Sequence, residues 1–88
     1  MRDYGNVSFI KRGKNRLKVF MAVEGTSMPS ELVIKIYGRR SNTYFNIISR
    51  ALAELKRHGL VRVVNPADKT GRLYELTKRG LTLRKKLS

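Results

Sequence analysis

A change of hydrophobic period at Gly59 constrains the fold of this chain more than any other feature. Over residues 42–58 the apolar side chains fall at spacings of three and four, which predicts an amphipathic helix. Its expected core face consists of Phe45, Ile48, Ala51, Leu52 and Leu55. Glycine readily ends a helix, and after Gly59 the apolar residues change from the helical period to a period of about two. The chain must therefore combine helices with strands.

Residues 60–64 and 73–77 share this period of two and are predicted to be strands of a hairpin. The polar loop 65–72 between them contains Pro66 and Gly71, which favour turns. Upstream, residues 15–24 and 28–37 predict two further helices, the second with Pro29 in its first turn and Gly38 at its end. Thr77 is placed to cap a short C-terminal helix. The expected fold class is α+β.

Two local points stay open from the residues alone. Residues 7–12 fit either a short helix or an extended arm. The helix that contains Pro29 begins either after Met28 or one residue earlier, with Ser27 as its cap. With 88 residues and no cysteine, the chain is predicted to form a single domain, 1–88, with a core over about 14–82 and no disulfide framework.

The charge balance indicates a polyanionic partner. Lys and Arg number 20 against 6 Asp and Glu, a formal net charge of +14. Self-repulsion of this size disfavours a compact state unless a polyanion is nearby, so nucleic acid is the leading partner and an anionic membrane surface the second. No apolar run approaches the ~20 residues that span a bilayer, and the first residues lack the apolar stretch of a signal peptide. We expect a cytoplasmic protein.

The order and spacing of several stretches resemble a known family. These stretches are NRLKVF (15–20), PSEL (29–32), SRALAEL (49–55), GLV (59–61) and GRLYELTKRG (71–80). Together they resemble the winged helix-turn-helix DNA-binding domains of prokaryotic and archaeal transcription regulators, the ArsR-like and MarR-like groups. The resemblance implies sequence-specific binding of double-stranded DNA, with helix 42–58 in the major groove and the hairpin loop 65–72 as a wing on the backbone or in the minor groove. It implies a transcription regulator but says nothing of an effector, and we expect the protein to be associated with the nucleoid.

Two independent arguments select the same residues of helix 42–58. A helical wheel turns Thr43, Asn46, Ile47 and Arg50 away from the expected core, and the family pattern places base contacts at 46, 47 and 50. Asn46 is suited to adenine, Arg50 to guanine or a phosphate, and Ile47 to a thymine methyl group. Arg57 is expected to meet backbone or solvent rather than bases. The plain alternatives are a solvated arginine, a local hydrogen bond of Asn46, and a place for Ile47 at the core margin.

Two further groups complete the predicted DNA surface. The turn before the helix supplies Arg39, Arg40, Ser41 and Asn42, and the wing supplies Lys69, Thr70 and Arg72. Phosphate contact is the functional interpretation, and a solvated turn or hairpin tip is the alternative. The basic residues between Lys11 and Lys18 either extend the footprint or are plain surface charge.

Other functions find little support in the residues. The lone His58 at a helix C-terminus and six scattered carboxylates form no catalytic or metal-binding set, so we expect no enzyme, metal or cofactor. A non-specific architectural DNA-binding protein and an RNA-binding winged helix remain alternatives. A homodimer through the first helix (Val19, Val23) or the C-terminal helix (Leu83, Leu87) is a further possibility.

Overall fold

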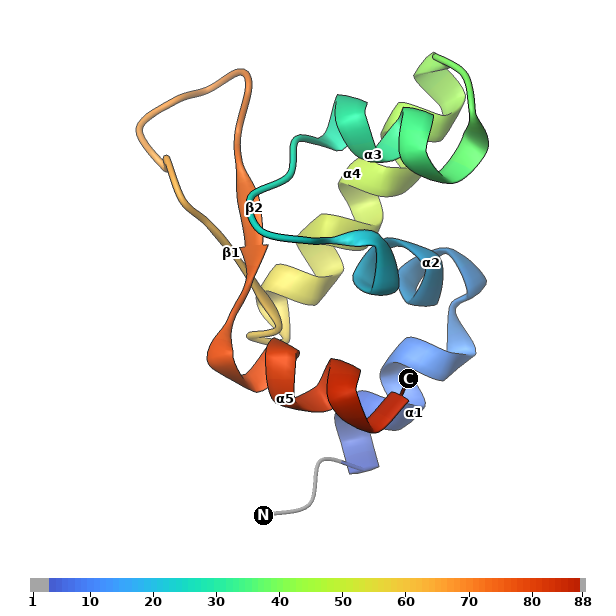
Figure 1. Cartoon of the computed structure of the whole chain (residues 1–88), viewed down its shortest axis with the longest axis vertical. Helices are drawn as coiled ribbons and strands as arrows, with labels where there is room; N and C mark the ends of the chain where they lie inside the picture. The colour runs from blue at the N-terminus through green and yellow to red at the C-terminus, as the bar shows by residue number, and fades with distance from the viewer. Residues whose placement is uncertain (1–3, 88) are drawn as a thin grey trace.

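Helices make up most of the described chain and carry a small hairpin on one side (Figure 1). The computed structural model describes residues 4–87. In chain order the elements are α1 (Tyr4–Arg12), α2 (Lys14–Ala22), α3 (Pro29–Tyr37), α4 (Asn42–Arg57), β1 (Val61–Val63), β2 (Tyr74–Leu76) and α5 (Lys78–Leu87). The predicted α+β class is confirmed, with five helices and one two-stranded antiparallel sheet in residues 4–87.

The core lies where α2, α3 and α4 pack on one another, and α1, α5 and the hairpin add side chains to it. Its largest fully buried side chains include Phe20, Leu32, Ile48, Leu52, Leu55 and Leu60. Burying each of these contributes about 1.5–3 kcal/mol. Val19, Val23 and Leu83 are also buried within the chain. The apolar surplus that suggested a dimer contact is therefore used by the chain's own core.

The segment that fitted either a helix or an arm is helical and forms most of α1. Ile10 is fully buried, which anchors α1 to the core. Gly13 separates α1 from α2, its N–H donating to the Ile10 carbonyl at 3.3 Å and its carbonyl accepting from Leu17 N–H at 3.0 Å. The sequence predicted a core that starts at about residue 14, but the buried Ile10 shows that the core includes earlier residues.

The start of α3 settles the open question of its cap. The N-cap residue is Met28, whose N–H donates to Glu31 Oε1 at 2.8 Å. Ser27 does not cap, because its hydroxyl donates to the Glu24 carbonyl at 3.2 Å and its backbone pairs with Tyr74. Pro29 then occupies the first helical position, where a missing N–H costs nothing.

The link from α3 to α4 is a tight turn. Gly38 has a φ of +77°, a left-handed conformation that glycine adopts without strain, and it ends α3 as predicted. Ser41 is the N-cap of α4, and its Oγ accepts from Tyr44 N–H at 3.4 Å. The helix begins at Asn42 and ends at Arg57, with His58 as its C-cap. The predicted bounds are correct to one residue.

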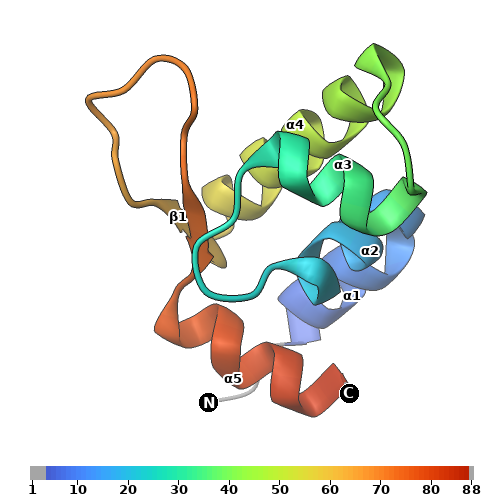
Figure 2. The same cartoon turned by 45° about the horizontal axis from the view of Figure 1, so that its top comes forward.

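The strands of the hairpin are shorter than predicted, with three residues each instead of five. Val61 pairs with Leu76 and Val63 with Tyr74, while the intervening Arg62 and Glu75 form an ion pair at 2.5 Å. An isolated bridge between Ser27 and Tyr74 adds the link between α2 and α3 to the edge of this sheet. The loop of the hairpin projects away from α5 (Figure 2).

Helix α5 is held against the corner between α4 and β1. Thr77 caps it as predicted, since Gly80 N–H donates to Thr77 Oγ1 at 3.0 Å, and the same hydroxyl donates to the Gly59 carbonyl at 2.7 Å. A Cβ on Gly80 would lie 2.2 Å from the Leu60 carbonyl oxygen. The absence of a side chain at residue 80 therefore permits this close approach of helix and strand.

Candidate nucleic-acid interface

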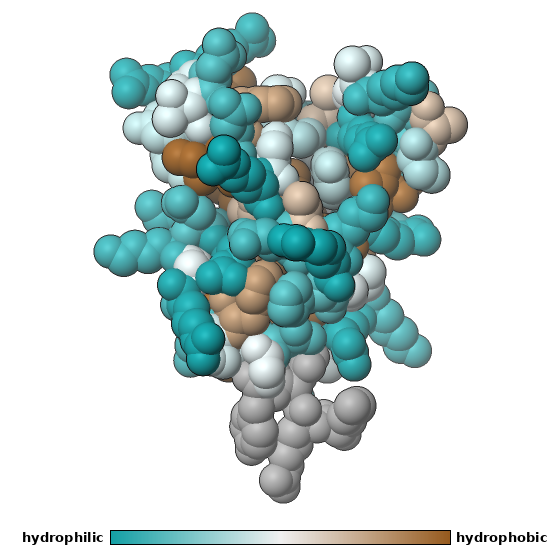
Figure 3. All heavy atoms as spheres, turned by 180° about the vertical axis from the view of Figure 1, so that it is seen from behind, coloured by the Kyte–Doolittle hydropathy of each residue, from teal (hydrophilic) through white to brown (hydrophobic). Residues whose placement is uncertain are grey.

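The outer face of α4 is polar and open to solvent. Thr43, Asn46 and Arg50 are exposed there, as the helical wheel predicts, and Asn42, Ala53 and Arg57 are exposed as well. Ile47 is half-buried at the edge of this face, which agrees with the alternative of a place at the core margin. α4 lies at the back of the molecule in Figure 1, so Figure 3 views the face that it forms. Hydrophilic side chains cover most of that face (Figure 3).

The turn that leads into α4 brings further cations to the start of this face. Arg39 and Arg40 are exposed, whereas Ser41 is half-buried and its oxygen is engaged as the helix cap. The rings of Tyr37 and Tyr44 stack with centroids 3.9 Å apart and 6° between their planes, which fastens the end of α3 to the start of α4. The Arg39 guanidinium carbon lies 5.8 Å from the Tyr44 centroid. One face of each tyrosine ring is therefore covered by the other ring.

The loop of the hairpin is shaped by Asn65, a residue outside the predicted site. Its side-chain amide donates to Asp68 Oδ2 at 2.8 Å and to the Gly71 carbonyl at 3.2 Å, and its oxygen accepts from Leu73 N–H at 2.7 Å. Asparagine side chains commonly bond to nearby backbone in turns. An Asn directly after a predicted strand could therefore have indicated this role from the sequence.

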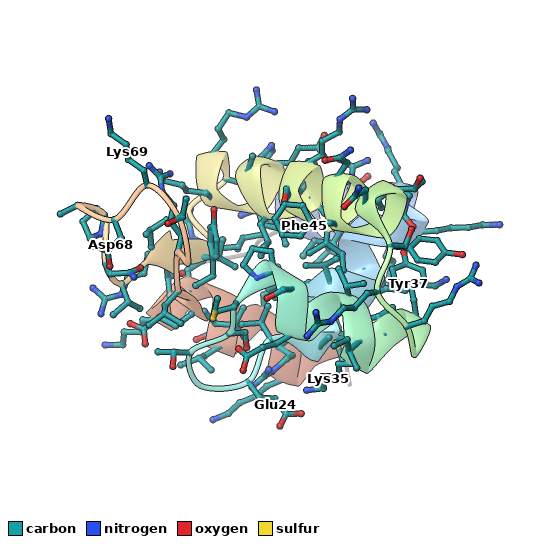
Figure 4. All side chains as sticks on the ribbon, turned by 90° about the horizontal axis from the view of Figure 1, so that it is seen from above. Glu24, Lys35, Tyr37, Phe45, Asp68 and Lys69 are labelled. Atoms are coloured by element: carbon teal, nitrogen blue, oxygen red, sulfur yellow. The ribbon has the colours of Figure 1, made fainter. Side chains whose placement is uncertain are left out.

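The three predicted wing residues differ in their surroundings. Lys69 and Thr70 are exposed, but Arg72 is half-buried and its Nε donates to the Asp68 carbonyl at 3.0 Å. Arg72 therefore braces the loop from within. In the view from above, Lys69 points to the same side of the molecule as the outer face of α4 (Figure 4). The ion pair of Glu24 with Lys35, at 3.3 Å, lies on the opposite side.

Phe45 corrects the predicted core face of α4. Ile48, Ala51, Leu52 and Leu55 are buried as expected, but Phe45 is 41% exposed. It lies between α3 and α4 (Figure 4), in a groove of about 300 Å³. That groove is lined by Ser30, Val33, Arg40, Ser41, Asn42 and Phe45. A helical wheel gives the direction of a side chain but does not show whether neighbouring elements cover it. At this groove, Val33 of α3 is the only buried apolar residue among the lining residues, so Phe45 stays partly exposed.

A second groove, of about 280 Å³, lies on the other flank of α4. It is lined by Gly13, Lys14, Asn15, Arg16, Ile47, Arg50, Ala51 and Glu54. Its lining includes three cationic side chains and one carboxylate. The basic segment around the start of α2 therefore lies beside Arg50, so part of the cluster between Lys11 and Lys18 adjoins the outer face of α4.

Two further observations concern other kinds of site. Within residues 4–87 no group of three or more His, Cys, Asp and Glu side chains is arranged to hold a metal ion. The single histidine stacks on Phe9, with centroids 3.6 Å apart, and its Nδ1 lies 3.2 Å from Asn6 Oδ1. None of the described helices has the length and apolarity that crossing a bilayer requires.

Comparisons of this chain with models of protein families, with curated proteins and with solved structures find no match. Any assignment of function therefore rests on the physical character of the surface described above.

Proposed function

We propose that this chain is a winged helix-turn-helix domain that binds double-stranded DNA, and that it serves as a sequence-specific transcription regulator. The observation that carries the proposal is the outer face of α4, where Asn46, Arg50 and Arg57 are exposed along one line. Of the exposed residues on that face none is acidic. The order of α2, α3, α4 and a following hairpin agrees with the fold that the sequence resembles.

In this proposal α4 enters the major groove and its first turns meet base edges. Asn46 offers a bidentate donor and acceptor for adenine, and Arg50 a fork of donors for guanine or a phosphate. Ala53 has a small side chain and is exposed, so it lets the helix axis approach the duplex. The exposed ring of Phe45 adds an apolar surface beside these residues, suited to a thymine methyl group.

The flanking cations are assigned to the phosphate backbone. Arg39 and Arg40 precede the helix, and Lys69 and Thr70 stand on the loop that serves as the wing. Arg72 supports that loop through its bond to Asp68, which leaves other N–H groups of its guanidinium for a phosphate. Such contacts position a protein on DNA without reading sequence.

A second candidate is an architectural DNA-binding protein of the same fold, with little sequence preference and residence on the nucleoid. The net charge of +14 favours it, because basic residues such as Lys78, Lys85 and Lys86 lie on α5, away from the outer face of α4 (Figure 4). Non-specific binding draws on charge of this kind.

Selection from a random duplex pool separates the two candidates. A regulator enriches a site that it prefers by about 1,000-fold or more over random duplex. Replacing Arg50 with Ala is expected to weaken that preference, whereas Lys69→Ala is expected to weaken all duplexes about equally. If the pool yields no enriched sequence although duplexes bind, the regulator assignment is wrong and the architectural one stands.

A further inference from the structure

The groove between the start of α2 and the middle of α4 holds two cations, Lys14 and Arg16, that the proposed DNA contacts do not use. We propose that it binds a phosphate group of the DNA backbone, with Arg16 as the principal contact and Lys14 beside it. The inference rests on the proposed function, since it extends the footprint of the same duplex. It also gives α1, which the family resemblance does not cover, a part in binding.

The charges in the groove suit an anion. Lys14 and Arg16 come from the first turn of α2, Arg50 comes from α4, and the only carboxylate among the lining residues is Glu54. The ion pairs described above join Lys35 to Glu24 and Arg62 to Glu75, and Glu54 makes no such direct pair with Lys14, Arg16 or Arg50. Asn15 adds a side-chain amide to the lining, although its oxygen accepts from the Tyr37 hydroxyl at 3.4 Å.

Arg16 is held in place by an aromatic ring. Its guanidinium carbon lies 4.2 Å from the centroid of Phe9, and the His58 ring stacks on Phe9 at 3.6 Å with 11° between the planes. Two groups this close to one ring must occupy its opposite faces, so Phe9 is enclosed between His58 and Arg16. Stacking uses the face of a guanidinium and leaves its N–H edges available, and a planar fork so held matches a phosphate bidentately.

Gly13 provides the space in which the guanidinium lies. A Cβ at this position would fall 2.2 Å from Arg16 Nε and 2.9 Å from its guanidinium carbon. The backbone of Gly13 has φ −107° and ψ 110°, which any residue adopts. Its lack of a side chain therefore serves Arg16 and not the backbone, and Gly13→Ala is expected to displace the guanidinium while leaving its charge.

The position of the groove relative to α4 fits a duplex. Ile47 and Arg50 line the groove and also border the outer face of α4. The wing and the connection between α1 and α2 lie on opposite sides of the molecule (Figure 1). Cations thus stand on both flanks of the proposed recognition helix, as the two phosphate strands do along the major groove, which is about 12 Å wide.

The test compares Arg16→Gln with Lys35→Gln, which removes one exposed positive charge on α3, on the side of the molecule opposite the outer face of α4. Binding of a fluorescent random-sequence duplex is measured at several salt concentrations. We expect Arg16→Gln to weaken binding about tenfold at low salt and to make the slope of log K against log[salt] shallower by about 0.9, the effect of one lost phosphate contact. Lys35→Gln is expected to stay within about twofold of the wild type.

A double-mutant cycle tests the positioning by Gly13. We expect Gly13→Ala to weaken binding about threefold to tenfold in the wild-type background and to have no effect in the Arg16→Gln background. An equal loss in both backgrounds, or an Arg16→Gln variant that behaves like Lys35→Gln, overturns this inference. Failure of the wild-type chain to bind any duplex is a different outcome, since it overturns the proposed function itself.

Discussion

The backbones of Ser27 and Tyr74 exchange two hydrogen bonds, each 2.8 Å long from N–H to carbonyl oxygen. Ser27 belongs to the link between α2 and α3, and Tyr74 opens the returning strand of the hairpin. The bridge thereby ties the base of the hairpin to the helices, so the direction of its loop relative to α4 is set by backbone geometry. Lys69 on that loop and Arg50 on α4 are thereby held in one relative arrangement, which their proposed contacts with one duplex require.

The bridge predicts a difference between two substitutions at residue 27. Ser27→Pro removes the N–H that bonds to Tyr74 and is expected to lower the free energy of unfolding by about 3 kcal/mol or more. Ser27→Ala keeps the bridge and loses only the hydroxyl bond to Glu24, at a cost of about 0.5–1.5 kcal/mol. Urea unfolding of both variants checks this, and equal losses would mean that the bridge does not support the fold.

Phe45 is expected to affect binding more than folding. Replacing a fully buried Phe with Ala costs about 3–5 kcal/mol. Because Phe45 is 41% exposed, Phe45→Ala should lower the free energy of unfolding by less than this. The same change removes an apolar contact with DNA, and we expect duplex affinity to fall about fivefold, which is about 1 kcal/mol. Unfolding and duplex titration of one preparation give both numbers. A large loss of stability with unchanged duplex affinity would mean that Phe45 serves the core and not DNA binding.

Asn65 is predicted to hold the shape of the wing. Asn65→Ala removes two bonds that its amide donates and one that its oxygen accepts, including the bond from Leu73 N–H. We expect faster hydrogen exchange at Leu73 and a loss of about 1–3 kcal/mol in stability. Pro66→Ala alters the same loop without removing any of these bonds and serves as the control. If exchange at Leu73 is equally slow in both variants, the loop does not depend on Asn65.

Two helical glycines are expected to respond in opposite directions to the same substitution. At Gly80 a new Cβ would meet the Leu60 carbonyl oxygen, and overpacking of this kind costs about 1–3 kcal/mol. At Gly5 in α1 a new Cβ would meet no atom within 4 Å apart from the adjacent residues and the backbone of its own helix, so Gly5→Ala should stabilise the chain by about 0.5–1 kcal/mol. Thermal unfolding of both variants measures the signs. A stabilising Gly80→Ala would show that α5 is not held close to β1.

The sequence predicted those parts of the fold that depend on local periodicity. The bounds of α4 followed from the spacing of Ile48, Leu52 and Leu55, and the cap of α5 from Thr77. Phe45 was placed wrongly because a wheel assumes that the core runs the whole length of the helix. The candidate site was likewise predicted only in part. The exposure of Asn46 and Arg50 followed from the wheel, but the hydrogen bond of Arg72 to the Asp68 carbonyl depends on loop geometry that no sequence pattern encodes.

The contacts across α1 were also beyond local patterns. The enclosure of Phe9 between His58 and Arg16 joins residues from α1, α2 and the end of α4, which lie far apart in the chain. No spacing rule connects them. Likewise, Val19 and Val23 exceed what one core face of a helix needs, and they are buried in a core to which α1 and α5 also contribute side chains.

Salt dependence of duplex binding tests the central claim most directly. With about five phosphate contacts, the plot of log K against log[salt] for double-stranded DNA should have a slope near −4.5, at about −0.9 for each contact. Asn46→Ala and Arg50→Ala should each weaken binding of the preferred duplex site relative to the wild type. Structured RNA at equal salt should compete poorly with the duplex. A slope near zero, no effect of the two α4 variants, or displacement of duplex by structured RNA would contradict the account.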